Sequence, residues 1–437
     1  MGLVSCVRIA RSFAGTWSIW RARFPADHLV RVVWSFVEAL DLAALYEGIR
    51  ARDDVAGRPT PDPKVLLALW LYATAEGIGS ARALEQLCRN HAAYRWLLGG
   101  VPVNYHGLSD FRTAHGAVLD RVLTESVAGL MAAGVIELDE VAVDGTKVQA
   151  NAGRGSFRGA GGMTRFEAAA RERVAQLKAE LVSDSSASER RRRAAAERAA
   201  ADVAARAEAA RRKLAELQAE KARRTKTHPG EEAGKSEPQA STTDPEARVM
   251  KMADGGFRPA YNLFVAASAK SQVIVDVAVT DRRNDTGMAQ PMVTTILTRY
   301  GRAPRRLLVD TKAATADDIV ALATRPEAPV VVYSPPPPDK EGASPATVRQ
   351  RERKRAKEPP ALKQWRARMA SPEGQAVYAR RGAIETVNGN LKNHGLRRFF
   401  LRGFAKIGCE ALLHAGKRIK VNSAVRPQSL HSAFTGN

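Results

Sequence analysis

Cysteine is scarce in this chain, with three among 437 residues, at positions 6, 88 and 409. They are far apart, and no two of them form a Cys-x-x-Cys pair. The eight histidines are scattered as well, without a His-x-x-x-His pair. This pattern argues against a zinc site or a disulfide framework, and it favours a reducing compartment.

Long apolar runs are missing too. No stretch of about 18 uninterrupted apolar residues is present, so no segment is suited to span a bilayer. The start, MGLVSCVRIARSFAGTW, resembles an export signal only superficially, because Arg8 and Arg11 interrupt its apolar region. We therefore expect a cytoplasmic protein with an unstructured or loosely packed lead-in over residues 1–25, and no membrane partner.

Acidic residues are few relative to basic ones. The chain has 46 Asp and Glu against 68 Lys and Arg, which gives a net charge of +22. Such an excess predicts a polyanionic partner, DNA or RNA in preference to a membrane surface. The hydrophobic content of 45% is ample for a buried core, and the length predicts two to four folding units.

The first part of the chain has a helical pattern. From about residue 26 to 134, apolar residues recur three and four positions apart, which predicts an all-α domain. Two interpretations of residues 79–115 stay open: a helix-turn-helix with four polar side chains near DNA, and a plain helical bundle. Those four side chains are Arg89, Asn90, His106 and Arg112.

Period-two alternation then replaces the helical pattern. It predicts a strand from Leu138 to Asp144, ended by Gly145, so that the Asp144 carboxylate can reach a cleft. A lone aspartate in such a place is more often a turn cap. A second aspartate, Asp310, ends the apolar run RRLLVD, and it is poorly placed to cap the next helix, which is predicted to begin nearer Thr315.

The segments around Asp310 alternate between strand and helix. Two adjacent strands followed by this alternation predict a mixed sheet rather than an all-parallel one. The predicted strands cover residues 261–268, 272–280, 305–310 and 328–334, and the predicted helices cover 287–301 and 314–325.

A helical segment interrupts the predicted sheet. Residues 164–224 have very high helix propensity and a Ser/Asp-rich break at 183–188, which predicts an inserted antiparallel helical hairpin. Its apolar stripe is thin, so the pair is expected to be half solvated or to pack on DNA or a partner subunit. The polar residues 225–243 are typical of a linker.

Four chemically matched side chains recur near the end of the chain, at offsets 0, 3, 7 and 14. They are Tyr378, Arg381, Glu385 and Lys392. On a helix they fall within roughly 60° of one another. A carboxylate between phosphate-seeking cations suits metal-assisted phosphodiester chemistry, although charges of this density are more commonly a solvated helix face.

A basic and aromatic segment, LKNHGLRRFFLRGFAK, follows this stripe. Its cations predict nonspecific phosphate affinity, and its phenylalanines are expected to pack rather than to stack on bases. The cations concerned are Arg397, Arg398, Arg402 and Lys406.

With these residues in order, the chain resembles the bacterial insertion-sequence transposases of the DDE type. The specific match is the Tyr-x2-Arg-x3-Glu-x6-Lys signature, which marks one subgroup of them. Supporting matches are the segments VDGTKVQANA, TDPEARVM, YNLFVAAS and GLRRFFLRG, and residues 26–115 resemble the N-terminal domain of such enzymes.

The resemblance implies an α+β fold with a ribonuclease H-like mixed sheet and flanking helices. An all-α domain would precede this sheet and a helical insertion would interrupt it. The expected parts are a lead-in (1–25), an N-terminal domain that binds DNA ends (26–134), a catalytic domain (135–163 and 244–414), the insertion with its linker (164–243) and a tail (415–437).

The resemblance also implies a function. The chain would bind the terminal inverted repeats of its element, cut there, and join the freed 3′-hydroxyl to target DNA. Asp144, Asp310 and Glu385 would hold two Mg²⁺ ions, for which Mn²⁺ can substitute. The expected partner is double-stranded DNA, with a homodimer in the synaptic complex of a nucleoid-associated bacterial protein.

The expected DNA contacts come from the same resemblance. Tyr378, Arg381 and Lys392 would hold the phosphates of the element's ends. Arg397, Arg398 and Arg402 would add contacts to the DNA.

Two segments depart from the family pattern. DTKA stands at 310–313, where a small residue and an aromatic usually follow the aspartate, and HAGKRIKVN stands at 414–422, in place of an apolar helix. They leave open a decayed or repurposed transposase that binds DNA without cutting it. A repair or defence nuclease with the same core fits the carboxylates equally well, and a coiled-coil structural protein fits only residues 164–224.

Overall fold

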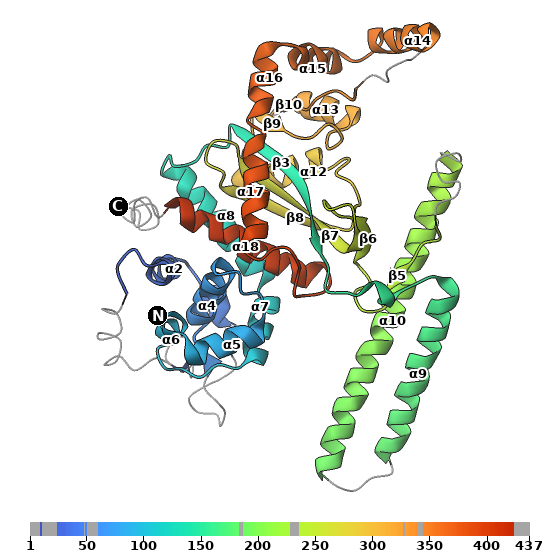
Figure 1. Ribbon diagram of the computed structural model, residues 1–437. Coiled ribbons are helices and arrows are strands. Elements are labelled where there is room, and N and C mark those ends of the chain that lie inside the picture. The colour runs from blue at the N-terminus through green and yellow to red at the C-terminus, as the bar shows by residue number, and fades with distance from the viewer. Residues whose placement is uncertain are drawn as a thin grey trace.

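The computed structural model comprises a helical N-terminal part, a mixed sheet flanked by helices, and a long helical hairpin that projects away from the sheet (Figure 1). The structure describes residues 9–10, 24–47, 49, 60–182, 187–227, 236–326, 328–338 and 344–423. Most of the lead-in predicted for residues 1–25 lies outside this part. Within it, strand β1 (Ile9–Ala10) pairs in parallel with β2 (Thr60–Pro61).

The N-terminal part is helical, as its apolar periodicity predicts. Its central helix is α4, in which every residue except Lys64 is buried because apolar side chains surround the helix. Asp62 caps the start of α4, where its side chain accepts a hydrogen bond from the Lys64 amide at 2.9 Å. The helices are α2 (Leu29–Glu38), α3 (Ala43–Glu47), α4 (Pro63–Ala75), α5 (Ala81–Asn90), α6 (Ala92–Leu98), α7 (Tyr105–Ala114) and α8 (Gly116–Ala132).

Arg112 corrects one detail of the helix-turn-helix interpretation. Its side chain is buried, with the guanidinium 4.2 Å from the centre of the Trp70 ring and Nη1 donating to the Gly79 carbonyl at 2.5 Å. It therefore stabilises the packing of α7 on α4, and the expectation that it lies near DNA is wrong. Arg89, Asn90 and His106 are exposed.

The sheet has the strand order β10-β9-β3-β7-β6, and β8 also pairs with β7. β9 is parallel to both β3 and β10, whereas β7 is antiparallel to its three partners. The mixed sheet and the α+β class are therefore confirmed. The strands are β3 (Glu140–Gln149), β6 (Arg248–Lys251), β7 (Phe257–Ser268), β8 (Ile274–Thr280), β9 (Arg306–Leu308) and β10 (Val331–Tyr333).

β3 is longer than its sequence suggests. The strand continues beyond Asp144 to Gln149, because Gly145 and the residues after it remain paired with β7. Asp144 therefore lies in the middle of a strand, and the prediction of a strand end was wrong. Asp310 does follow its strand closely, and the next helix begins after Thr315, as expected; Thr315 and Asp318 form a capping box there.

Helices flank the sheet and connect its strands. The sequence pattern predicts one continuous helix from Tyr378 to Lys392, whereas in the structure the chain leaves α16 and enters α17 at Arg380 and Arg381. The helices are α12 (Ala289–Tyr300), α13 (Ala316–Ala323), α14 (Pro345–Ala356), α15 (Pro360–Ala370), α16 (Pro372–Ala379), α17 (Gly382–Asn393) and α18 (Phe404–Ser423).

The inserted segment is a helical hairpin, α9 (Ala160–Val182) and α10 (Ala187–Thr227), whose helices pack on each other. It leaves and rejoins the sheet domain beside the short pair formed by β4 (Phe157–Arg158) and β5 (Ala240–Ser241). A 3-10 turn, η1 (Arg154–Ser156), precedes β4.

α18 joins the two main parts of the molecule, because it packs on α4, α7 and α8 and also on β8. The helix continues past residue 414, where the sequence was expected to pass into a tail. Leu413, His414 and Ala415 are buried in it, so the start of the HAGKRIKVN segment retains its packing.

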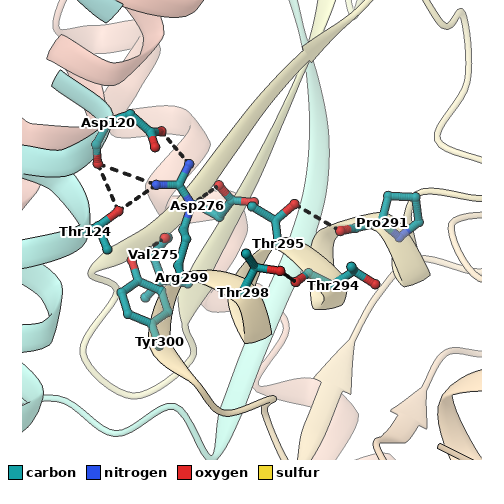
Figure 2. A network of polar contacts seen from close by, with 10 residues as sticks. All are labelled: Asp120, Thr124, Val275, Asp276, Pro291, Thr294, Thr295, Thr298, Arg299 and Tyr300. Carbon is teal, nitrogen blue, oxygen red and sulfur yellow. Dashed lines mark hydrogen bonds and ion pairs between the residues drawn. The ribbon is translucent and has the colours of Figure 1, made fainter. Parts of the chain in front are cut away.

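A polar network crosses the same junction (Figure 2). Arg299 of α12 lies 2.5 Å from Asp120 of α8 and 3.2 Å from Asp276 of β8, and it also donates to Thr124. Asp276 is almost fully buried. Within the part of the chain that the structure describes, no helix is both long enough and apolar enough to cross a membrane.

Candidate active site

Arg381 lies between two of the three predicted carboxylates. Its Nη2 donates to Oδ1 of Asp144 at 3.1 Å, and its Nη1 donates to Oε1 of Glu385 at 3.0 Å. The guanidinium is largely buried, whereas the Glu385 side chain is 66% exposed. One cation thus bridges an acid in the middle of the sheet and an acid on a helix, although the two are far apart in sequence.

The third predicted carboxylate, Asp310, lies on the neighbouring strand connection. β3 and β9 are parallel, and Ala142 lies opposite Leu308. Asp144 and Asp310 each lie two residues beyond this pair, so they are at the same level of the sheet. The charge of Asp310 acts on Asp144, Arg381 and Tyr378. The structure therefore brings Asp310 into the same electrostatic site, with its side chain exposed.

The remaining members of the Tyr-Arg-Glu-Lys set surround this site. Tyr378 lies in the last turn of α16, Glu385 in the first turn of α17 and Lys392 in its last turn. Burial raises the pKa of the Tyr378 hydroxyl, and the neighbouring carboxylates raise it further, against the effect of Arg381. Burial lowers the pKa of Lys392, and Asp144 opposes that shift.

The surroundings of Asp144 shift the pKa of its carboxyl group. Burial raises the pKa of its carboxyl, Arg381 acts to lower it, and the charges of Asp285 and Asp310 raise it again. Three carboxylates in one place repel one another, so a cation among them stabilises the ionised form. In this structure the guanidinium of Arg381 has that role.

Two further residues contact this site and were missed in the sequence. Asn388 is buried, and its Nδ2 donates to Oδ2 of Asp144 at 3.1 Å. It lies three residues after Glu385 and four before Lys392 in α17, so it shares a face of that helix with them. Asp285 accepts from Nδ2 of Asn262 at 2.7 Å, and its position shortly after the apolar strand β8 was the signal that could have identified it.

A cavity of about 540 Å³ opens beside these carboxylates. Gly145, Asp285 and Lys392 contribute to its lining. A Cβ atom at Gly145 would lie only 2.3 Å from Oδ1 of Asp285. Because Gly145 has no side chain, Asp285 can approach β3 closely. The cavity therefore extends to Gly145, the residue that follows Asp144.

The predicted basic residues after α17 lie along the end of β3. Arg398 donates to the side-chain oxygen of Asn151 at 3.0 Å, and Arg402 donates to the Asn151 carbonyl at 2.9 Å. Arg397 donates to the Lys392 carbonyl at 3.3 Å. All three are exposed. Phe399 between them is fully buried, as the packing interpretation predicts, whereas the neighbouring Phe400 is 42% exposed.

The donor set around Arg381 suits a hard divalent cation, because it offers carboxylate and amide oxygens. The buried Oδ1 of Asn388 has no hydrogen-bond partner in the described structure, so it remains able to bind a water or a cation. Among the residues that the structure describes, no three acidic, histidine or cysteine side chains converge closely enough to hold an ion while Arg381 lies between them.

Comparison with known families is consistent with this geometry. Residues 18–114 match a transposase domain (DUF772), and residues 223–416 match a transposase DDE domain. The second match includes Asp310 and Glu385, whereas Asp144 lies between the two matched regions. No curated protein and no solved structure gives a significant match.

The α-helical N-terminal part, the mixed sheet and the two matched regions agree with one another. DDE transposases generally use divalent metal ions and act on DNA. The chain therefore belongs to the insertion-sequence transposases with a DDE domain.

Proposed function

We propose that this transposase binds the terminal inverted repeats of its own element, cuts DNA there, and transfers the freed 3′-hydroxyl to target DNA. The observation that carries the proposal is the position of Arg381, which links Asp144 to Glu385 beside Asp310. Cations near clustered carboxylates suit phosphodiester chemistry, because they can bind the phosphates on either side of the reacting bond.

Asp144, Asp310 and Glu385 are the proposed metal ligands, and Mg²⁺ is the proposed ion, with Mn²⁺ as a substitute. Two such ions activate the attacking oxygen and stabilise the leaving oxygen when they are bound. Asn388 would keep the Asp144 carboxylate in one orientation through its hydrogen bond of 3.1 Å.

The cations and Tyr378 are assigned to DNA. Tyr378, Arg381 and Lys392 would hold phosphates of the element's end, and we propose that the chain belongs to the Tyr-Arg-Glu-Lys subgroup. Arg397, Arg398 and Arg402 would bind the backbone further along, because they are exposed on one side of the end of β3. We also propose a homodimer in the synaptic complex, and association with the bacterial nucleoid.

Glu385→Gln tests this assignment. The substitution keeps the shape of the side chain but removes its charge, so Mg²⁺-dependent nicking of element-end DNA should be lost while DNA binding stays nearly intact. Glu373→Gln, an exposed acid of α16, is the matched control and should nick normally. Equal loss of nicking and binding in Glu385→Gln would contradict a metal-ligand role.

A second candidate is a transposase that binds its ends without cutting them. The DTKA segment supports it, because Lys312 stands two residues after Asp310 in place of the usual aromatic. Nicking by the wild-type protein with Mg²⁺ or Mn²⁺ would exclude this candidate. Binding of element-end DNA without nicking at any metal concentration would favour it.

A further inference from the structure

A second cavity, of about 520 Å³, lies between helix α10 of the inserted hairpin and strand β6 of the sheet. Its lining is strongly basic, with six cationic side chains against the acids Glu220 and Glu237. The two acids pair within the lining, with Arg248 at 3.1 Å and Lys221 at 2.8 Å. The six cations are Arg154, Lys221, Arg224, Arg248, Lys251 and Arg283.

The cations of this cavity repel one another. Burial lowers the pKa of Arg283, and the charges of Arg248, Arg224 and Arg154 lower it further, against the effect of Glu220. In addition, Nε of Arg248 is buried without a hydrogen-bond partner in the described structure. A bound anion would relieve the repulsion and supply an acceptor.

An exposed aromatic ring lies at the same cavity. Phe257 is the first residue of β7, pairs with Lys251 of β6, and is 68% exposed. Aromatic rings among cations are typical of surfaces that bind nucleic acid strands, where cations contact phosphates and rings contact sugars or bases.

Lys251 connects this cavity to the candidate active site. It lines the cavity between α10 and β6, and it also lines the cavity that contains Gly145, Asp285 and Lys392. Gly145 directly follows Asp144 in β3. A chain of phosphates could therefore pass from the carboxylates to the inserted hairpin along a continuous basic surface.

We propose that the DNA held at Asp144 continues past Lys251 and lays its backbone in the cavity between α10 and β6. The inserted hairpin is then a DNA-holding arm, and Phe257 contacts the sugars or bases of the same segment. This inference rests on the proposed function, because it takes the DNA at the carboxylates as its starting point.

The test compares two double variants that lose the same charge. Arg154→Gln with Arg283→Gln removes two cavity cations, whereas Arg212→Gln with Arg223→Gln removes two exposed cations of α10 that do not line the cavity. Binding of element-end duplex DNA is measured over a range of salt concentrations. The cavity variant should bind about tenfold more weakly, with a salt slope smaller by about two, and the control should match the wild type.

Shortened duplexes separate direct contact from an indirect effect on folding. Wild-type affinity should fall in a step once the duplex no longer reaches the cavity, and the cavity variant should show no such step. Phe257→Ala should weaken binding with an unchanged salt slope, because it removes no charge. An unchanged slope and an unchanged step in the Arg154/Arg283 variant would overturn the inference.

Wild-type nicking decides which idea has failed. If the wild type nicks element-end DNA and the cavity variant binds that DNA normally, the inference is wrong and the proposed function stands. If the wild type neither binds nor nicks this DNA, the proposed function itself is wrong. Binding of an acidic peptide at the cavity, with DNA affinity unaffected, would also overturn the inference.

Discussion

Asn388 illustrates how much a single neutral side chain contributes to a charged site. It is buried against β3, and its amide group donates to the carboxylate of Asp144, the most buried of the three predicted acids. A carboxylate without such a partner can rotate, and its geometry toward a cation is then less well defined.

Asn388→Ala should therefore reduce Mg²⁺-dependent nicking by roughly 10- to 100-fold, with little change in DNA affinity. The Mg²⁺ concentration that gives half-maximal nicking should rise as well, because Asp144 loses its orientation. Asn390→Ala, two residues along the same helix, is the control. A normal Mg²⁺ dependence in Asn388→Ala would show that Asp144 does not need this hydrogen bond.

At this scale the sequence identified the charged residues better than their neutral partners. The spacing of Tyr378, Arg381, Glu385 and Lys392 was informative because it repeats with the helix period, and Asn388 fits the same repeat without standing out by charge. Asp285 could not be assigned, because its approach to Asp144 depends on how β3 and β8 flank β7. Such a contact is set by strand order, which local periodicity does not contain.

The inserted hairpin behaves as an element with its own small core. Met163 of α9, Ala210 and Leu214 of α10 and Ala240 of β5 form a cluster separate from the main core. Its links to the sheet domain include the ion pair of Lys213 with Asp281 at 2.9 Å, whose side chains are 19% and 22% exposed. The hairpin also packs on β4 and β5, where it leaves and rejoins the sheet domain.

Replacing residues 160–238 by a short Gly/Ser linker should leave the rest of the molecule folded. The two ends of the hairpin lie beside the β4–β5 pair, so a short linker can close the gap. We expect the Tm to fall by less than about 5 °C in a calorimetric scan, because the hairpin has its own small core, separate from the main core of the sheet domain. Loss of a cooperative unfolding transition would show that the hairpin is part of the main folding unit.

The elements were more predictable than their boundaries. The helical hairpin, the strand and helix order around Asp310, and the cap at Thr315 follow from propensity and turn residues. The extension of β3 beyond Gly145 does not, because pairing with β7 outweighs the weak strand preference of glycine. Tertiary pairing decides such cases, and it involves residues more than a hundred positions away.

For the whole molecule, two buried acids lie where the N-terminal helices meet the sheet domain. Burial raises the pKa of Asp276 to about 7, despite the neighbouring Arg299 and with Asp120 also nearby. Burial likewise raises the pKa of Glu410 of α18 to about 7, while Arg112 opposes the shift. The Glu410 carboxylate also accepts hydrogen bonds from the backbone amides of Phe400 and Leu401.

These shifts predict a loss of stability as the pH rises. In the unfolded chain both acids release their protons near pH 4, whereas the folded protein retains them to about pH 7. The free energy of unfolding should therefore decrease between about pH 5 and 7, by up to about 1.4 kcal/mol per pH unit for each group. Thermal unfolding over this range measures the effect.

Asp276→Asn should remove about half of this pH dependence, because it eliminates one of the two titrating groups. Asp254→Asn changes an exposed acid in the turn between β6 and β7 and is the matched control. A slope in Asp276→Asn equal to that of the wild type would mean that Asp276 is already ionised in the folded protein.

Under the proposed function, the bridge that Arg381 makes between Asp144 and Glu385 would couple two binding events. A divalent ion and this guanidinium would compete for the same carboxylates, and a phosphate that draws Arg381 away would leave those carboxylates open to the ion. By thermodynamic reciprocity, DNA must then tighten metal binding by the factor by which the metal tightens DNA binding. A transposase that works as proposed would bind little metal until it meets its own ends, and this would limit stray damage to the chromosome that carries it.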